Sequence, residues 1–237
     1  MKKNFIGIFF AIVAIIAVAL IVLMLNYKKG ISTPEVSDAA KFKDEYVSLN
    51  DKTNSSNKTY PQVTINDNNK FHYATETEIR DILNGQTGVI YFGFPTCPWC
   101  RNMVSILDEV SLSYSTDKIY YYNIKDIRST ITVNDNNELE TKKGTDFYYQ
   151  LLEKLDSSLE DYTVTDKKGK TIKTGEKRLY APTVIFVKNG EVVDFVEGTV
   201  DSQKDPYVAL TETQRNELIS KYQEGFNKLG DICDEKC

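Results

Sequence analysis

The chain has 237 residues, of which 41% are hydrophobic and 27% are charged, which is ordinary for one globular domain with an appendage. Its net charge is −5, and this becomes −9 once the four lysines that flank an apolar run at the amino end are left out. Such an acidic balance excludes a protein that binds nucleic acid non-specifically.

The amino end contains an uncharged run of 21 residues, 5–25, with lysines on both sides. A helix rises about 1.5 Å per residue, so this run spans the roughly 30 Å hydrocarbon layer of a membrane. A secretory signal peptide is the alternative, but its apolar region would be shorter and a small-x-small cleavage motif would follow it. No such motif follows Leu25. We therefore expect residues 1–29 to be an uncleaved transmembrane anchor.

The cysteines indicate which side of the membrane the rest of the chain occupies. Four cysteines behind an export-type amino end fit an oxidising compartment better than the cytosol. By the positive-inside rule, the lysines on the two sides of the apolar run only slightly favour one orientation of the helix in the membrane. We predict a single-pass protein of the cytoplasmic membrane whose soluble part is extracellular.

Residues 30–60 are expected to lie outside the folded domain. Apolar side chains recur with helical spacing over residues 35–49, which predicts a short amphipathic helix. The polar stretch DKTNSSNKTYP that follows is typical of a linker. The folded domain is therefore expected to span residues 61–230, with residues 231–237 as a tail.

The first half of this domain reads as alternating strands and helices. Residues 71–74 suit a short strand, and the capping box at Thr75 opens a helix that stops near Asn84. Residues 88–94 are apolar on both faces, as in a buried central strand, and a helix follows from Cys100. Since the next strand is residues 118–124, these elements predict a right-handed crossover with a parallel sheet.

Residues 128–175 are predicted to be an insertion. They begin with a long polar excursion, continue with a helix over residues 146–159, and end in a hairpin or loop over residues 163–173. Beyond them, residues 181–187 and 191–196 are two strands that an Asn-Gly turn joins as an antiparallel hairpin. A capping box then opens a closing helix that runs to Leu229.

Cys97 and Cys100 lie where the apolar strand passes into the following helix. A zinc site would need further ligands from Cys233, Cys237 and His72, but the order of elements does not resemble a zinc ribbon. A structural disulfide that closes so small a loop stabilises little. A redox pair fits better, because the unpaired N–H groups and the dipole at a helix start favour a thiolate. We predict a redox pair with no metal and no organic cofactor.

The positions within the Cys-Pro-Trp-Cys stretch suggest a role for each residue. Cys97, at the helix start, would be the attacking sulfur, and Cys100, one turn further on, would resolve the mixed disulfide. Pro98 suits the first helical turn because it needs no N–H partner there, and it is expected on the substrate-binding side of the site. Trp99 is expected at the rim of the site in contact with substrate, with simple packing as the alternative.

Together these features resemble the thioredoxin superfamily over roughly residues 71–229. The resemblance rests on the Cys-Pro-Trp-Cys stretch after an apolar strand and on the downstream segment Ala181-Pro182-Thr183, which enters a hairpin. It implies an α/β thioredoxin fold, with a central mixed sheet flanked by helices and an insertion before the proline strand. It also implies that Pro182 is cis and packs against the active-site sulfurs, and that the backbone of Ala181 pairs with bound substrate.

A narrower likeness is to membrane-anchored thioredoxin-like proteins of Gram-positive bacteria, including bacteriocin-transport accessory proteins. Their active-site stretch looks like FGxPxCPxC, which matches residues 92–100 here. The buried acid of thioredoxins, however, matches Tyr91, and the lysine paired with that acid matches Tyr121. The usual proton relay for Cys100 is therefore missing, and its deprotonation must rely on water or on other residues such as a tyrosine.

Cys233, Cys237 and His72 are further candidates for residues of the site. Cys233 and Cys237 follow the last helix and are expected to form a local disulfide, with a relay to the redox pair or an idle tail as alternatives. His72 is the only histidine. Its place in an early strand favours a structural role over that of a general base.

The sequence therefore predicts a membrane-anchored, extracytoplasmic thiol–disulfide oxidoreductase. Its partners would be protein thiols and disulfides, together with a membrane redox partner if the pair is kept reduced outside the cell. The direction of exchange does not follow from the sequence, since it depends on how well the reduced thiolate is stabilised. The alternative is a binding or accessory module for an exported peptide or a membrane partner, in which the cysteines only change its affinity.

Overall fold

The structure is a computed structural model that describes residues 13–24 and 36–230. The chain divides into two compact units, Met1–Ser37 and Asp38–Cys237. In the first unit, residues 13–24 are helical and their side chains are exposed. The predicted anchor lies partly outside the described residues, and among those that are described no helix is long and apolar enough to cross a membrane.

The second unit is built on a mixed sheet with the strand order β1-β3-β2-β8-β9. β1 and β2 run parallel to β3, whereas β8 runs antiparallel to both β2 and β9. Every residue of β2 is buried, which confirms the prediction of a central strand covered on both faces. The strands are β1 (Phe71–Tyr73), β2 (Gly88–Gly93), β3 (Ile119–Asn123), β8 (Thr183–Lys188) and β9 (Glu191–Glu197).

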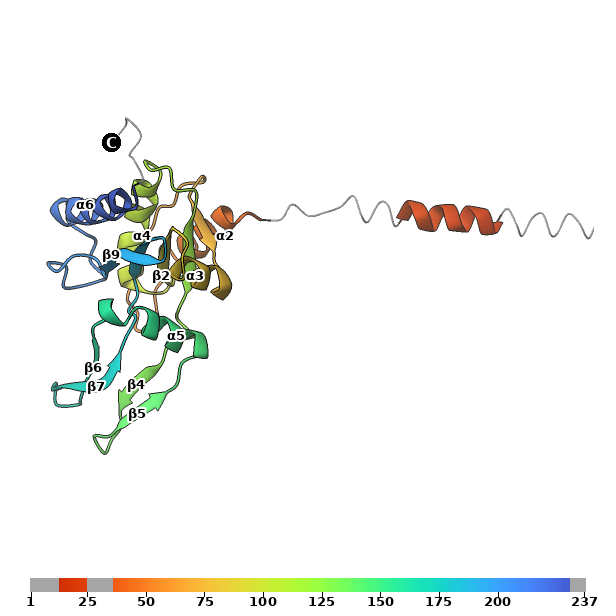
Figure 1. The fold of residues 1–237 in the computed structure, drawn as a ribbon. Coiled ribbons are helices and arrows are strands. Elements are labelled where there is room, and N and C mark those ends of the chain that lie inside the picture. The colour runs from red at the N-terminus through yellow and green to blue at the C-terminus, as the bar shows by residue number, and fades with distance from the viewer. Residues whose placement is uncertain (1–12, 25–35, 231–237) are drawn as a thin grey trace, which may run out of the picture. The chain divides into compact units, whose positions relative to one another are not determined.

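Helices cover both faces of this sheet (Figure 1). Alternate residues of β2 point into two separate cores, because side chains in a strand alternate between faces. Tyr91 belongs to the core that contains residues of α4 and α6, and Phe92 to the core that contains residues of α3 and α5. The helices are α3 (Glu76–Leu83), α4 (Pro98–Ser111), α5 (Asp146–Lys154) and α6 (Glu212–Leu229). This mixed α/β architecture is confirmed, and it is compatible with a thioredoxin-like fold.

A further helix, α2 (Asp38–Val47), belongs to the same compact unit. Its residues Phe42 and Tyr46 are fully buried, and the Phe42 ring stacks on Phe71 with 3.8 Å between centroids. Large aromatic rings one helical turn apart bury much apolar surface, so α2 is held firmly. The compact unit therefore begins at Asp38, whereas the sequence places the start of the folded domain at residue 61.

His72 lies in β1 between two carboxylates. Its Nδ1 is 2.6 Å from Oδ2 of Asp38, and its Nε2 is 2.9 Å from Oε1 of Glu78. Since Asp38 begins α2 and Glu78 lies in α3, the ring ties both helices to the sheet. These contacts support the structural role predicted for His72.

The segment between β3 and β8 forms two hairpins separated by α5. The predicted hairpin is present as β6 (Asp161–Thr165) and β7 (Thr171–Lys177), whereas the hairpin of β4 (Thr130–Val133) and β5 (Leu139–Lys142) was not predicted. All four residues of β5 are exposed, so no apolar alternation marks this strand. The two hairpins extend together from the body (Figure 1). The Tyr162 hydroxyl is hydrogen-bonded to the backbone of Ile131. The predicted helix over 146–159 ends at Lys154, and a short 3₁₀ turn follows it.

Candidate redox site

The cysteine pair lies at the carboxyl end of β2, where the chain enters α4. Cys97 is the N-cap of α4, and its sulfur accepts a hydrogen bond from the backbone N–H of Cys100 at 3.4 Å. Pro98 takes the first helical position, where a missing N–H costs nothing. Both cysteines are free thiols, with Cys97 6% exposed and Cys100 fully buried. The local sequence thus places one sulfur at the surface of the site and the other behind it.

The surroundings of the two sulfurs separate their acidities. A hydrogen bond from the Cys100 thiol, the backbone N–H groups of Cys100 and Trp99, and the charge of Arg128 together lower the pKa of Cys97, although burial opposes them. Burial and the neighbouring Cys97 raise the pKa of Cys100. The negative charge of the reduced pair therefore rests on Cys97, the sulfur that substrate can reach. This distribution suits Cys97 for attack and Cys100 for resolution.

The proline segment lies against the same sulfur. The Ala181–Pro182 peptide bond is cis, as the resemblance implies. When protonated, the Cys97 thiol donates a hydrogen bond to the carbonyl oxygen of Ala181 at 3.4 Å, across 84 positions of sequence. Trp99 is half-buried and lines a cavity together with Ala181. The structure thus brings the redox pair together with all four residues predicted on the substrate side of the site, which are Pro98, Trp99, Ala181 and Pro182.

Two tyrosines, Tyr91 and Tyr121, lie in the same core as the cysteine pair. Tyr91 and Tyr121 are register partners in β2 and β3, and their rings stack with 5.4 Å between centroids. The Tyr91 hydroxyl interacts with the Cys100 thiol, and this hydrogen bond lowers the pKa of Cys100 against the effect of burial. The Tyr46 hydroxyl, from α2, lies 2.8 Å from that of Tyr91. A hydrogen-bonded tyrosine pair therefore stands behind the resolving thiol.

Arg128 is a residue of the site that the sequence reading left out. Its guanidinium lies 5.1 Å from the ring centroid of Phe94, just before the cysteine loop, and its charge lowers the pKa of Cys97. A signal for it was present. Parallel strands end at the same edge of a sheet, so residues soon after β3 are expected near those that follow β2.

Replacement of Arg128 by glutamine is expected to raise the pKa of Cys97, because a nearby cation favours the thiolate. The thiolate fraction at neutral pH then falls, and the midpoint of the pH profile for alkylation by iodoacetamide moves to higher pH. Arg80→Gln is the matched control, since it removes the same charge from α3, where the guanidinium pairs with Glu76 at 2.9 Å. An unchanged midpoint in Arg128→Gln, or an equal shift in the control, would contradict this role.

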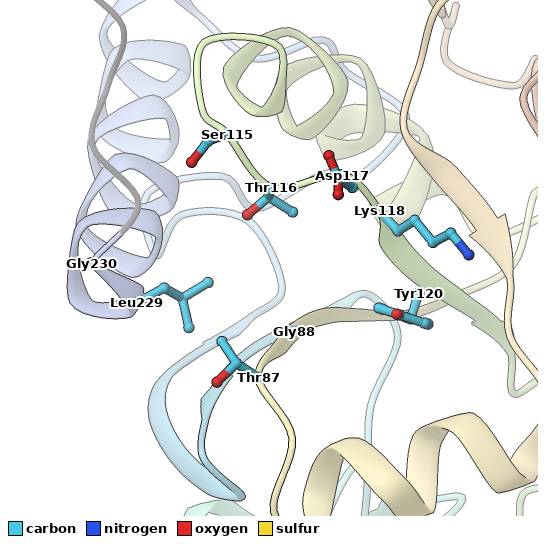
Figure 2. Close-up of a pocket in the computed structure, with 9 residues that line it drawn as sticks. All are labelled: Thr87, Gly88, Ser115, Thr116, Asp117, Lys118, Tyr120, Leu229 and Gly230. Atoms are coloured by element: carbon cyan, nitrogen blue, oxygen red, sulfur yellow. The ribbon is translucent and has the colours of Figure 1, made fainter.

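A second pocket, of about 430 Å³, lies at the opposite end of the sheet. Figure 2 shows it between the start of β2, the loop that precedes β3 and the end of α6, with Thr87, Thr116 and Leu229 around it. Cys97 follows the carboxyl end of β2, whereas this pocket borders its amino end. It is therefore not part of the redox site.

The structure does not describe every predicted site residue. Cys233 and Cys237 lie outside the described residues. Within residues 13–24 and 36–230, no group of three or more His, Cys, Asp or Glu side chains is placed to hold a metal ion. No protein-family model, curated protein or solved structure matches the chain.

Proposed function

We propose that the protein is a thioredoxin-like thiol–disulfide oxidoreductase that acts on protein cysteines. The observation that carries this proposal is the unequal pair of free thiols at the start of α4, with Cys97 stabilised as a thiolate and Cys100 buried, next to the cis Ala181–Pro182 bond. Thiol–disulfide exchange needs one reachable thiolate and a second thiol held behind it. The compatible sheet architecture supports the same proposal.

The proposed exchange takes place in two steps. The Cys97 thiolate attacks a substrate disulfide, so that a bond forms between Cys97 and one substrate sulfur while the other substrate sulfur leaves as a thiolate and takes up a proton. Cys100 then gives up its proton and attacks Cys97, which forms the Cys97–Cys100 disulfide and releases the second substrate thiol. Two electrons pass from the pair to the substrate together with the proton of Cys100, and the second proton that the substrate takes up comes from solvent because Cys97 reacts as the thiolate. The reverse sequence oxidises a substrate dithiol.

We place this activity outside the cytoplasmic membrane, with the amino-terminal segment as the anchor. The uncharged run of 21 residues and the four cysteines support this location. Protease access to the domain in intact protoplasts tests it, and protection of the domain would contradict it.

A trapping experiment with the full-length chain tests the activity. Cys100→Ser is expected to accumulate disulfide-linked complexes with protein substrates, because Cys97 can still attack but nothing resolves the product. Cys97→Ser should accumulate none, and it should fail to reduce the disulfides of insulin. Acid-quenched membranes run on non-reducing gels, with and without dithiothreitol, give the measurement. If Cys100→Ser trapped no complexes and cells with Cys97→Ser behaved like cells with the unaltered protein, a binding module for an exported peptide or a membrane partner would be the better description.

A further inference from the structure

A cavity of about 270 Å³ lies beside the reactive sulfur. Trp99, between the two cysteines, forms part of its wall, and Ala181, whose carbonyl oxygen is 3.4 Å from the Cys97 sulfur, forms another part. The rest of the wall comes from the end of β9 and the loop after it, including Glu197, Thr199, Asp201 and Gln203. A substrate chain that reaches Cys97 along Ala181 therefore passes this cavity.

Glu197 contributes a carboxylate oxygen that is left unpaired. It is the last residue of β9 and lies opposite Thr183, immediately after the cis proline. Its Oε2 is buried and has no hydrogen-bond partner among the residues that the structure describes. Burial and the nearby charge of Glu160 raise the pKa of Glu197 to about 7. A buried polar atom without a partner is unfavourable, so this oxygen is a ready acceptor for a ligand that enters the cavity.

Two other polar side chains of the cavity, Thr199 and Gln203, already have hydrogen-bond partners. Thr199 Oγ1 donates to Gln203 Oε1 at 2.6 Å, and Gln203 Nε2 donates to the carbonyl oxygen of Val208 at 3.0 Å. Of the described residues that line the cavity, two are acidic and none is lysine or arginine. A cation is the ligand that best satisfies such a carboxylate, because charge-assisted hydrogen bonds are stronger than neutral ones.

We propose that this cavity receives a lysine or arginine side chain close to the reacting cysteine of the substrate, and that Glu197 is the residue that selects it. The inference rests on the proposed function, because it takes the segment at Ala181 as the path of the substrate. It adds a substrate class, namely cysteines with basic neighbours.

Peptide disulfides test this selection on the full-length Cys100→Ser protein in detergent. Three peptides differ only in the residues flanking one cysteine, which are arginine, glutamine or glutamate, and each cysteine carries a 5-thio-2-nitrobenzoate group. The Cys97 thiolate attacks the peptide sulfur, a Cys97–peptide disulfide forms, and the coloured thiolate leaves. The arginine peptide is expected to react about tenfold faster than the glutamate peptide, in the range measured for close charge pairs.

Glu197→Gln should reduce this ratio to about twofold, since only the long-range charge of the protein remains. Glu191→Gln is the matched control, because Glu191 is an exposed glutamate at the other end of the same strand. This control should keep the tenfold ratio. Should Glu197→Gln melt below the assay temperature, Glu197→Thr serves under the same criterion.

The outcomes separate this inference from the proposed function. A ratio near one between the rates of the arginine and glutamate peptides with the Cys100→Ser parent would overturn the selection by this cavity. An unchanged ratio in the Glu197 variant would do the same. Failure of all three peptides to react with the parent would instead overturn the exchange activity itself.

Discussion

Replacement of Tyr91 by phenylalanine is expected to slow the attack of Cys100 on the mixed disulfide by about tenfold to a hundredfold. The reason is that burial already raises the pKa of Cys100, and the Tyr91 hydroxyl acts in the opposite direction through its hydrogen bond. Hydrogen bonds to charged groups contribute about 1.5–3 kcal/mol, and each 1.4 kcal/mol is a factor of ten. Without this donor the pKa of Cys100 rises further, so less thiolate is present at neutral pH.

The measurement separates the two steps of exchange. After mixing with a disulfide substrate and acid quenching at successive times, Tyr91→Phe should accumulate the Cys97 mixed disulfide, whereas the rate of its formation changes less. The pH profile of resolution should move to higher pH. Tyr46→Phe should slow resolution less, because the Tyr46 hydroxyl acts on Cys100 only through the Tyr91 hydroxyl, which lies 2.8 Å from it.

Tyr222→Phe is the matched control for this series. The Tyr222 side chain is fully buried in the same core, and its hydroxyl has no hydrogen-bond partner within the described part of the chain. Removal of an unpaired buried hydroxyl is expected to be neutral or slightly stabilising. Resolution by Tyr91→Phe at the rate of this control would exclude the tyrosine pair from the mechanism.

The parts of the site that were predicted from the sequence depend on short-range order. An N-cap, a proline in the first turn and an apolar strand before them are set within a few residues, so the environment of Cys97 was predictable. The capping boxes at Thr75 and Thr211 were predictable for the same reason, and both are present. These features are specified by residues close together in the sequence, and the tertiary packing only has to be compatible with them.

The position of α2 could not be predicted in this way. Its amphipathic spacing indicates a helix, but an apolar face does not state which surface it will cover. The polar stretch that follows looks like a linker, yet the residues on its two sides are joined, since Asn50 forms two hydrogen bonds with the backbone of Val63. The placement of Tyr46 next to Tyr91 is therefore a consequence of tertiary packing across 45 residues.

The pairing register of β9 with β8 could not be predicted from the sequence either. The Asn-Gly turn predicts the hairpin correctly, and Lys188 pairs with Glu191 beside it. A bulge then shifts the pairing by one residue between Phe186 and Val187, so that Thr183 meets Glu197. A shift of one residue exchanges the two faces of a strand, and bulges of this kind are set by context. For this reason Glu197 was not among the predicted site residues.

Arg101 connects α2 to the redox site. Arg101 is only 1% exposed, and burial lowers the pKa of its guanidinium. No carboxylate pairs with it among the described residues; its partners are neutral oxygens. They are the carbonyl oxygens of Pro61 (2.7 Å), Tyr46 (2.8 Å) and Pro95 (3.3 Å) and the side-chain oxygen of Asn50 (2.7 Å). One side chain thus joins the end of α2, the segment after it and the loop before Cys97.

Arg101→Met is expected to lower the free energy of unfolding by about 3 kcal/mol. The variant leaves these acceptors without a donor, at about 1–3 kcal/mol for each one that stays buried, while it avoids the desolvation of a guanidinium. The free energy of unfolding of Arg101→Lys should lie between those of Arg101→Met and the unaltered protein, because one ammonium nitrogen cannot reach acceptors on three sides. Urea unfolding of the reduced protein measures the difference, and Trp99, the only tryptophan, reports it from the site itself.

Arg215→Met is the matched control, since Arg215 forms an exposed ion pair with Glu109 and should change stability by no more than about 1 kcal/mol. An equal loss in both variants would show that the buried guanidinium does not hold the site together. Hydrogen exchange gives a second test. If Arg101 fixes α2, the amides of α2 in Arg101→Met should exchange before those of β2. Because Tyr46 leaves with α2, the same variant should also resolve mixed disulfides more slowly, as we expect for Tyr46→Phe.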